Sequence, residues 1–172
     1  MIIWLTGLSG VGKSTLCEAL DQLIRPKFPG LVVLDGDVVR SAAGNDLSHS
    51  EEDRIVQFYR LQGLARALTD QGLIVIVAAV YNNKELLASN REVLAKYFEV
   101  FLEAPLELVV ARDAKQLYAQ AKIGKMSDVV GIDIVAHKPT KPDLVLDASL
   151  ELPPTEMAAQ VVSRIPWLGD HF

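Results

Sequence analysis

The sequence predicts a doubly wound α/β domain in which a mostly parallel, five-stranded sheet is flanked by helices. Two observations carry this prediction. Five short apolar runs do not alternate with polar residues, as is typical of strands covered on both faces in a parallel sheet. Segments with helical periodicity separate these runs, and such β-α alternation favours right-handed crossovers. At 172 residues the chain fits a single domain, which we expect to span residues 1–172.

The first apolar run, Ile2–Thr6, leads directly into a glycine-rich loop, Gly7–Ser14, with the sequence GLSGVGKS. This loop fits the pattern G-x-x-x-x-G-K-[ST]. An apolar stripe with helical spacing follows at Leu16, Ala19, Leu20 and Leu23. The segment therefore predicts a strand, a phosphate-binding loop and a helix in succession.

A loop of this kind surrounds the phosphates of a nucleoside triphosphate with backbone N–H groups, and the helix behind it presents its positive end. Lys13 would contact the β- and γ-phosphates, and the Ser14 hydroxyl would ligate Mg²⁺. Mg²⁺ is therefore the expected cofactor. We expect the nucleotide to be bound by Gly7, Ser9, Gly10, Val11, Gly12, Lys13, Ser14 and Thr15.

The second apolar run, Leu31–Leu34, is followed by two carboxylates and an arginine, in the sequence DGDVVR. In doubly wound folds the ligand lies at the carboxyl ends of the strands, where these residues fall. For Asp35 alone we favour a helix cap. For Asp37 together with Arg40, which would face the glycine loop, we favour a functional role.

The remaining elements follow the same alternation. A helical stripe runs through Ile55, Phe58, Leu61, Ala65 and Leu68. Ser48, with Glu51 three residues later, has the spacing of a capping box, and Gly72 is placed to end this helix. The other expected strands are Leu73–Val80, Phe98–Leu102 and Leu144–Leu146, and the other expected helices are Lys84–Lys96, Leu106–Arg112 and Thr155–Ile165. Residues 138–142 are expected to form the loop before the last strand.

Composition limits the partners of this chain. Its net charge of −5 argues against a broad electrostatic contact with nucleic acid. The longest apolar run is too short to span a bilayer, and no targeting segment is evident, so we expect no membrane partner. The single cysteine, Cys17, cannot form an internal disulfide, which favours a cytoplasmic location, and we expect it to pack within a helix.

Two classes of protein use this loop, a GTP-dependent switch and a phosphotransferase. A switch of the Ras type needs the guanine-reading pattern N-K-x-D. The only Asn-Lys pair, Asn83-Lys84, is followed by Glu85 and Leu86, so the aspartate is absent. A kinase needs a carboxylate near the acceptor hydroxyl and additional cations, which Asp37 and Arg40 offer.

With these motifs in place, the chain resembles the adenylyl-sulfate kinase (APS kinase) family of P-loop kinases. The resemblance covers nearly the whole chain in the same order. It is carried by IWLTGLSGVGKST and LDGDVVR, and then by residues 46–47, 50–54, 98–100, 104–108, 112–118, 131–133 and 141–144. It implies a kinase that uses ATP to phosphorylate the 3′-hydroxyl of adenylyl sulfate, both of them small nucleotide substrates. It also implies a homodimer.

The resemblance assigns roles to matching residues. Asp37 would orient or deprotonate the acceptor hydroxyl, so that Asp37 and Lys13 are the expected catalytic residues. Arg40 and Arg54 would bind the charged groups of the acceptor. A lid of approximately residues 112–131 would close over ATP, with Arg112 on the ATP and Lys115 toward the acceptor. The alternative for Arg112 is an ion pair with Asp113, and for Tyr118 we favour core packing.

The departures from the family cluster at the acceptor. His49 and Val129 stand where the family has two phenylalanines that sandwich the adenine, and Gln57 replaces an asparagine. We assign all three positions to the acceptor site. Loss of two stacking rings would weaken adenine binding, so a kinase of a cytidine-linked nucleotide in surface-polysaccharide synthesis is the alternative. A degraded kinase that binds nucleotide without transfer is the non-enzyme alternative.

Overall fold

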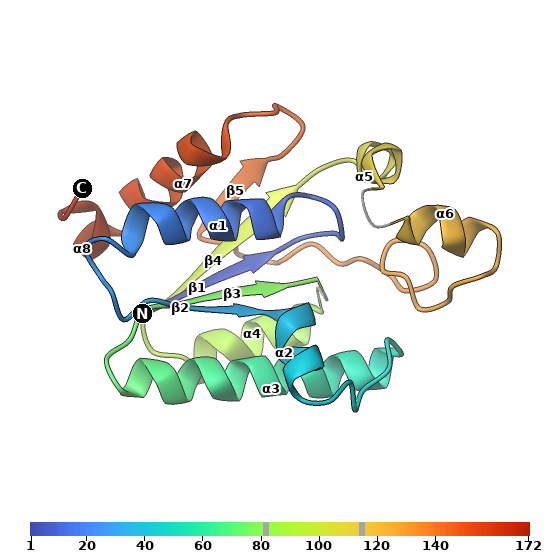
Figure 1. Ribbon diagram of the computed structural model, residues 1–172, viewed down its shortest axis with the longest axis horizontal. Helices are drawn as coiled ribbons and strands as arrows, with labels where there is room; N and C mark the ends of the chain where they lie inside the picture. Colours follow the sequence, from blue (N-terminus) through green and yellow to red (C-terminus); the bar gives the residue numbers. More distant parts are fainter. Residues whose placement is uncertain (81–82, 114–115) are drawn as a thin grey trace.

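The parallel sheet expected from the apolar runs is present. A computed structural model describes residues 1–80, 83–113 and 116–172, and within these ranges five parallel strands form one sheet of order β2-β3-β1-β4-β5 (Figure 1). The strands are β1 (Ile2–Thr6), β2 (Val32–Asp35), β3 (Val75–Ala79), β4 (Tyr97–Glu103) and β5 (Leu144–Asp147). Each lies within two residues of the predicted run at both ends, so the prediction of a doubly wound parallel sheet is confirmed.

Helices cover both faces of this sheet (Figure 1). On one side α1 (Lys13–Ile24) packs against α7 (Pro154–Ser163), which leads into α8 (Pro166–Gly169). On the other side lie α3 (Glu51–Asp70) and α4 (Lys84–Val93). The shorter helices α2 (Gly36–Ala42), α5 (Leu106–Arg112) and α6 (Leu117–Lys122) follow strand ends or connect elements. Of these eight, α2, α6 and α8 were not predicted: α6 and α8 are too short to show a periodic stripe, and α2 begins within the polar sequence that follows β2.

The central strand explains why the apolar runs do not alternate. Every residue of β1 is buried. Ile3 and Leu5 belong to the core beneath α1 and α7, whereas Ile2 and Trp4 belong to the core beneath α3 and α4. Cys17 is buried in the first of these cores, as expected, and burial raises the pKa of its thiol to about 12.

The start of α3 corrects one prediction. The cap is Ser50 rather than Ser48: the Ser50 hydroxyl accepts a hydrogen bond from the backbone N–H of Asp53. Ser48 instead donates from its N–H and its hydroxyl to the Asp53 carboxylate. Two serines two residues apart each have an acidic residue three positions later, so the sequence pattern alone could not select between them. Gly72 follows the end of the helix with a φ of +86°, as predicted.

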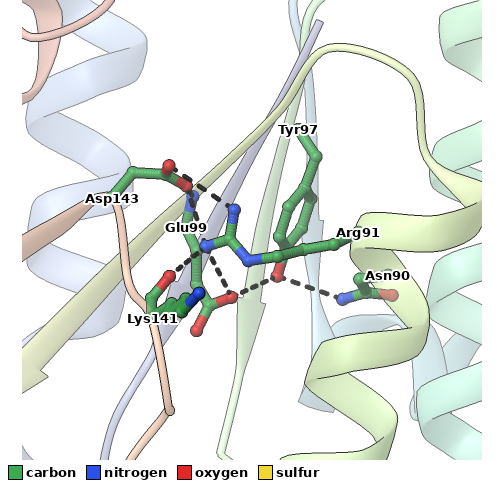
Figure 2. A network of polar contacts seen from close by, with 6 residues as sticks. All are labelled: Asn90, Arg91, Tyr97, Glu99, Lys141 and Asp143. Carbon is green, nitrogen blue, oxygen red and sulfur yellow. Dashed lines mark hydrogen bonds and ion pairs between the residues drawn. The ribbon is translucent and has the colours of Figure 1, made fainter.

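A partly buried polar network joins α4 to β4 and to the chain before β5 (Figure 2). The Arg91 guanidinium contacts the carboxylates of Glu99 at 3.3 Å and Asp143 at 3.0 Å. The Asp143 carboxylate accepts the Glu99 N–H at 2.7 Å, and the Tyr97 hydroxyl donates to Glu99 Oε2. The network therefore fixes where the chain enters β5 and, through β5, where the loop beyond it lies. Among the described residues, no helix has the length and apolar character that crossing a membrane requires.

Candidate active site

The loop between β1 and α1 has the backbone of a phosphate-binding loop. Gly7, Gly10 and Gly12 have φ angles of +149°, +79° and +108°, which favour glycine. At Gly7 a Cβ atom would lie 2.6 Å from the carbonyl oxygen of Leu102, so only glycine fits there. Helix α1 begins directly after Gly12 without a side-chain cap from the described residues. Its first N–H groups can therefore bind an anion.

Lys13 lies across this loop. Its ammonium donates to the carbonyl oxygens of Gly7 at 2.9 Å and Leu8 at 2.7 Å, and the side chain is buried. The positive charge is thus held at the loop itself, where the phosphates of a nucleotide would lie.

The loops that follow β1 and β2 meet at Ser14 and Asp35. The Ser14 hydroxyl donates to Asp35 Oδ2 at 3.3 Å. The other oxygen, Asp35 Oδ1, accepts the N–H groups of Asp37 at 2.9 Å and Val38 at 3.3 Å. The helix-cap interpretation of Asp35 is therefore confirmed, and the same carboxylate also contacts the phosphate-binding loop.

Asp37 lies in the first turn of α2 with its side chain at the surface. Asp35 holds the start of α2 and also contacts Ser14, so the first turn of α2, which contains Asp37, begins next to the phosphate-binding loop. A carboxylate in this position can receive a proton from a hydroxyl group that approaches the loop.

Two arginines organise the loop between α2 and α3. The buried Arg40 donates to the carbonyl oxygens of Leu47 and Ser48 at 3.1 and 2.6 Å. Arg54, in the first turn of α3, donates to the carbonyl oxygens of His49 at 2.8 Å and Asp128 at 2.7 Å. Arg54 therefore links the start of α3 to the segment after α6, within the expected lid.

His49 lies near both arginines. Its pKa is lowered from the ordinary value, first by desolvation of the imidazole and then by the positive charges of Arg40 and Arg54. The neutral imidazole is therefore the favoured form near pH 7. His49 can contact a ligand as a neutral ring, and the arginines supply the positive charge.

The other expected acceptor residues are less accessible. Gln57 is buried, with its amide donating to the carbonyl oxygen of Gly36 at 2.9 Å and accepting from Arg60. Val129 is buried within the core beneath α1 and α7. Contact of either residue with an acceptor stays a prediction. Lys115 lies outside the described residues.

Arg112 ends α5, as expected, but its partner differs from the alternative we considered. Its guanidinium donates to the carbonyl oxygen of Ala148 at 3.2 Å and pairs with Glu151 at 3.3 Å, so it connects α5 to the loop after β5. Asp113 instead accepts the N–H groups of Tyr118 and Ala119 at the start of α6. The interpretation of Arg112 and Asp113 as an ion pair was therefore wrong.

Sequence reasoning missed one contact of the phosphate-binding loop. Tyr118 is buried in the core, as we favoured, but its hydroxyl also donates to the carbonyl oxygen of Ser9 at 3.0 Å. The two residues are 109 positions apart, and no local pattern links them. The sequence signal available was only an isolated tyrosine within an expected lid.

A cavity of about 470 Å³ lies beside the same loop, over the carboxyl ends of β4 and β5. Leu8 of the loop, Pro105 and Leu106 at the start of α5, and Asp147 and Ser149 at the end of β5 line part of it. Strand order places it at the opposite edge of the sheet from β2 and Asp37.

Comparisons with known proteins agree with this geometry. The family model described as adenylylsulphate kinase matches residues 1–147. The bifunctional enzyme CysN/CysC of Xylella fastidiosa is 37% identical over 166 residues, which cover 95% of this chain and 26% of that enzyme. The adenylyl-sulfate kinase of Rippkaea orientalis is 39% identical over 149 residues, which cover 87% of this chain and 82% of the relative.

A solved structure is similar over nearly its whole length. The APS kinase CysC of Mycobacterium tuberculosis, in complex with AMPPNP and APS, has a TM-score of 0.87 and 36% identity to this chain, with 96% of each chain covered. The chain therefore corresponds to about a quarter of the bifunctional relative and to most of the other two proteins.

Proposed function

The chain belongs to the adenylylsulphate kinase family, and from this premise we propose that it transfers the γ-phosphoryl group of ATP to the 3′-hydroxyl of adenylyl sulfate. The observation that carries the proposal is the contact between Ser14 and Asp35. It brings the loop suited to the donor phosphates and the helix that presents Asp37 to one place. Phosphoryl transfer requires this juxtaposition of donor and acceptor.

On the donor side, the N–H groups of the loop and of the start of α1 would bind the phosphates of ATP. Lys13 would move from the carbonyl oxygens of Gly7 and Leu8 to the β- and γ-phosphates and stabilise the charge that develops during transfer. Arg112, which already bridges α5 and the loop after β5, would border the nucleotide at that edge.

On the acceptor side, Asp37 would accept the proton of the 3′-hydroxyl as its oxygen forms a bond to the γ-phosphorus. The bond between this phosphorus and the bridging oxygen breaks, and ADP leaves with that electron pair. The products are ADP and the 3′-phosphorylated acceptor. Arg40 and Arg54 would hold the anionic phosphosulfate group, because guanidinium groups form charge-assisted hydrogen bonds with such oxyanions.

The Ser14 hydroxyl and the Asp35 carboxylate are oxygen donors of the kind that Mg²⁺ prefers, so the residues present fit this cofactor. We propose that Ser14 holds the ion directly and that Asp35 orients the Ser14 hydroxyl. When bound, Mg²⁺ neutralises charge on the phosphates.

Incubation of the purified chain with ATP, Mg²⁺ and adenylyl sulfate tests the proposal. We expect equal amounts of ADP and 3′-phosphoadenylyl sulfate, resolved by mass, and none from a Lys13→Ala variant. Release of ADP without the phosphorylated acceptor, or no turnover at all, would contradict the proposal.

The same assay decides between acceptors. The comparisons support adenylyl sulfate and offer no support for a cytidine-linked nucleotide. We therefore expect adenylyl sulfate to be consumed first when both compounds are present at equal concentration with limiting enzyme. Preferential phosphorylation of the cytidine compound would overturn this choice of acceptor and leave the kinase assignment intact.

The homodimer and the cytoplasmic location stay proposals. The resemblance supports the first, and the single, buried Cys17 is consistent with the second. Light scattering of the purified chain measures its mass in solution, and a monomer at all concentrations would contradict the dimer.

A further inference from the structure

The hydrogen bond from Tyr118 to Ser9 connects the expected lid to the phosphate-binding loop. Tyr118 lies in the first turns of α6, with only 1% of its surface exposed. Its hydroxyl donates to the Ser9 carbonyl oxygen at 3.0 Å, across 109 residues of sequence. This contact joins α6 to the backbone that would surround the phosphates.

The Ser9 carbonyl oxygen belongs to a set of three successive acceptors in the loop. The carbonyl oxygens of Gly7 and Leu8 accept hydrogen bonds from the Lys13 ammonium. A bound nucleotide would compete for the Lys13 ammonium, so these two contacts can be lost when the phosphates arrive. The bond from Tyr118 is made by a neutral hydroxyl, for which the phosphates compete less strongly than for an ammonium. It can therefore persist with the nucleotide bound.

Tyr118 is itself held in place. The Asp113 carboxylate accepts the N–H groups of Tyr118 at 3.1 Å and Ala119 at 2.8 Å, so it caps the start of α6. One turn earlier, Val109 of α5 packs against Gly10, where a Cβ atom would lie 3.7 Å from the valine methyl group. Burial and the charge of Asp113 raise the pKa of Tyr118, which keeps its hydroxyl protonated and able to donate.

We infer that Tyr118 is a positioning residue for ATP: its hydroxyl turns the Ser9 carbonyl away from the phosphate site and keeps the loop N–H groups convergent. The kinetic test of this inference, the KM for ATP, rests on the proposed function.

Only part of the expected lid is free to move if Tyr118 stays bound to the loop. Tyr118 is buried at one end and Val129 at the other, whereas the residues between them are exposed or only partly buried. Closure over the nucleotides therefore involves residues 120–128, and the start of α6 stays attached to the loop. The lid expected from the sequence, 112–131, is longer than this segment.

A Tyr118→Phe variant removes the hydroxyl and keeps the ring in the core. We expect the dissociation constant for AMPPNP with Mg²⁺, measured by calorimetry, and the KM for ATP to rise about fivefold, as for the loss of one neutral hydrogen bond. The KM for adenylyl sulfate should be unchanged. Tyr97→Phe is the matched control, because it removes a buried hydroxyl that bonds to Glu99, far from the loop.

The outcomes separate the two proposals. Weaker AMPPNP binding by Tyr118→Phe supports the inference even if the chain does not phosphorylate adenylyl sulfate, which would overturn only the proposed function. Unchanged binding and KM for ATP, or the same weakening in Tyr97→Phe, would overturn the inference.

Amide hydrogen exchange of the unmodified chain gives a second test that needs no variant. We expect residues 116–119 to be equally protected with and without AMPPNP and adenylyl sulfate, and residues 120–128 to gain protection when both are bound. If residues 116–119 gained as much protection as residues 120–128, Tyr118 would move with the lid and the inference would be wrong.

Discussion

Asp35 and Asp37 are two positions apart and have different surroundings. Both oxygens of Asp35 are engaged, one by the start of α2 and one by Ser14. Asp37 lies at the surface of the first turn of the same helix. A carboxylate that holds a helix in place is poorly suited to exchange a proton with a substrate. In our proposal Asp37 serves the chemical step, and Asp35 supports the helix that carries it.

An Asp37→Asn variant should lower kcat roughly 10²- to 10⁴-fold, because it removes the base and the charge but hardly changes the volume. The dissociation constant for ATP should stay close to that of the unmodified chain. Single-turnover transfer and calorimetry measure the two quantities separately. A normal turnover number would remove Asp37 from catalysis, and parallel loss of ATP binding would point to a disturbed helix α2.

Arg54 connects the start of α3 to the segment after α6 and, by our proposal, contacts the anionic acceptor. Arg54→Ala should raise the KM for adenylyl sulfate roughly ten- to a hundredfold, the effect of losing a charge-assisted hydrogen bond. Arg66→Ala is the control on the same helix, since Arg66 is exposed and lies 3.9 Å from Asp70. An equal rise in KM in both variants would show that the effect comes from removing a positive charge from α3 and not from a contact between Arg54 and the acceptor.

At the scale of single elements, α3 contains a glycine that its position does not require. Gly63 lies in the middle of the helix at the surface, and a Cβ atom there would meet nothing within 4 Å. Gly63→Ala should therefore stabilise the chain by about 1 kcal/mol, because alanine loses less backbone entropy in a helix.

Thermal or urea unfolding of both chains measures this change in free energy. Gly7→Ala provides the contrast, since its Cβ atom would lie 2.6 Å from the Leu102 carbonyl oxygen, and it should be destabilising. If Gly63→Ala lowered the midpoint of unfolding, the exposed face of α3 would be in contact with something else, such as a second copy of the chain.

At the scale of the whole molecule, the network around Glu99 joins one face of the sheet to the strand at its edge (Figure 2). Glu99 is 2% exposed, and its pKa is raised, chiefly by desolvation and against the attraction of Arg91. Glu99 Oε1 has no hydrogen-bond partner among the described residues. The folded chain therefore binds the proton of Glu99 more tightly than the unfolded chain does.

As the pH rises from the ordinary glutamate pKa through the raised pKa of Glu99, the unfolded chain holds fewer protons at this site, so the contribution of Glu99 to stability falls. A Glu99→Gln variant should lose this decline, which urea unfolding at a series of pH values measures.

Asp46 supplies a control of opposite sign. A hydrogen bond from Arg60 lowers the pKa of its carboxyl group, so its contribution to stability is lost as the pH falls through that lowered pKa. Asp46→Asn should remove the loss of stability at low pH, whereas Glu99→Gln should remove the decline in stability toward neutral pH. An unchanged pH profile in Glu99→Gln would mean that water reaches the Glu99 carboxylate.

Local patterns of sequence determined the strands, the longer helices, the phosphate-binding loop and the place of Asp37 after a strand. Each depends on residues within a few positions of one another: an apolar run, a stripe at helical spacing, or glycines where φ must be positive. The same patterns carried the family resemblance. They failed where two local solutions were equally good, as at Ser48 and Ser50, and where a helix was too short to show a stripe.

Only the tertiary structure decided how these pieces form a site. The contact of Ser14 with Asp35, the pairing of Arg112 with Glu151 and the hydrogen bond from Tyr118 to Ser9 join residues that are 21, 39 and 109 positions apart. Such pairs depend on strand order and on which face of the sheet each helix covers. The sequence determined which residues could bind a nucleotide, and packing determined which of them touch, because a side chain reaches only the atoms that the fold brings within a few ångströms.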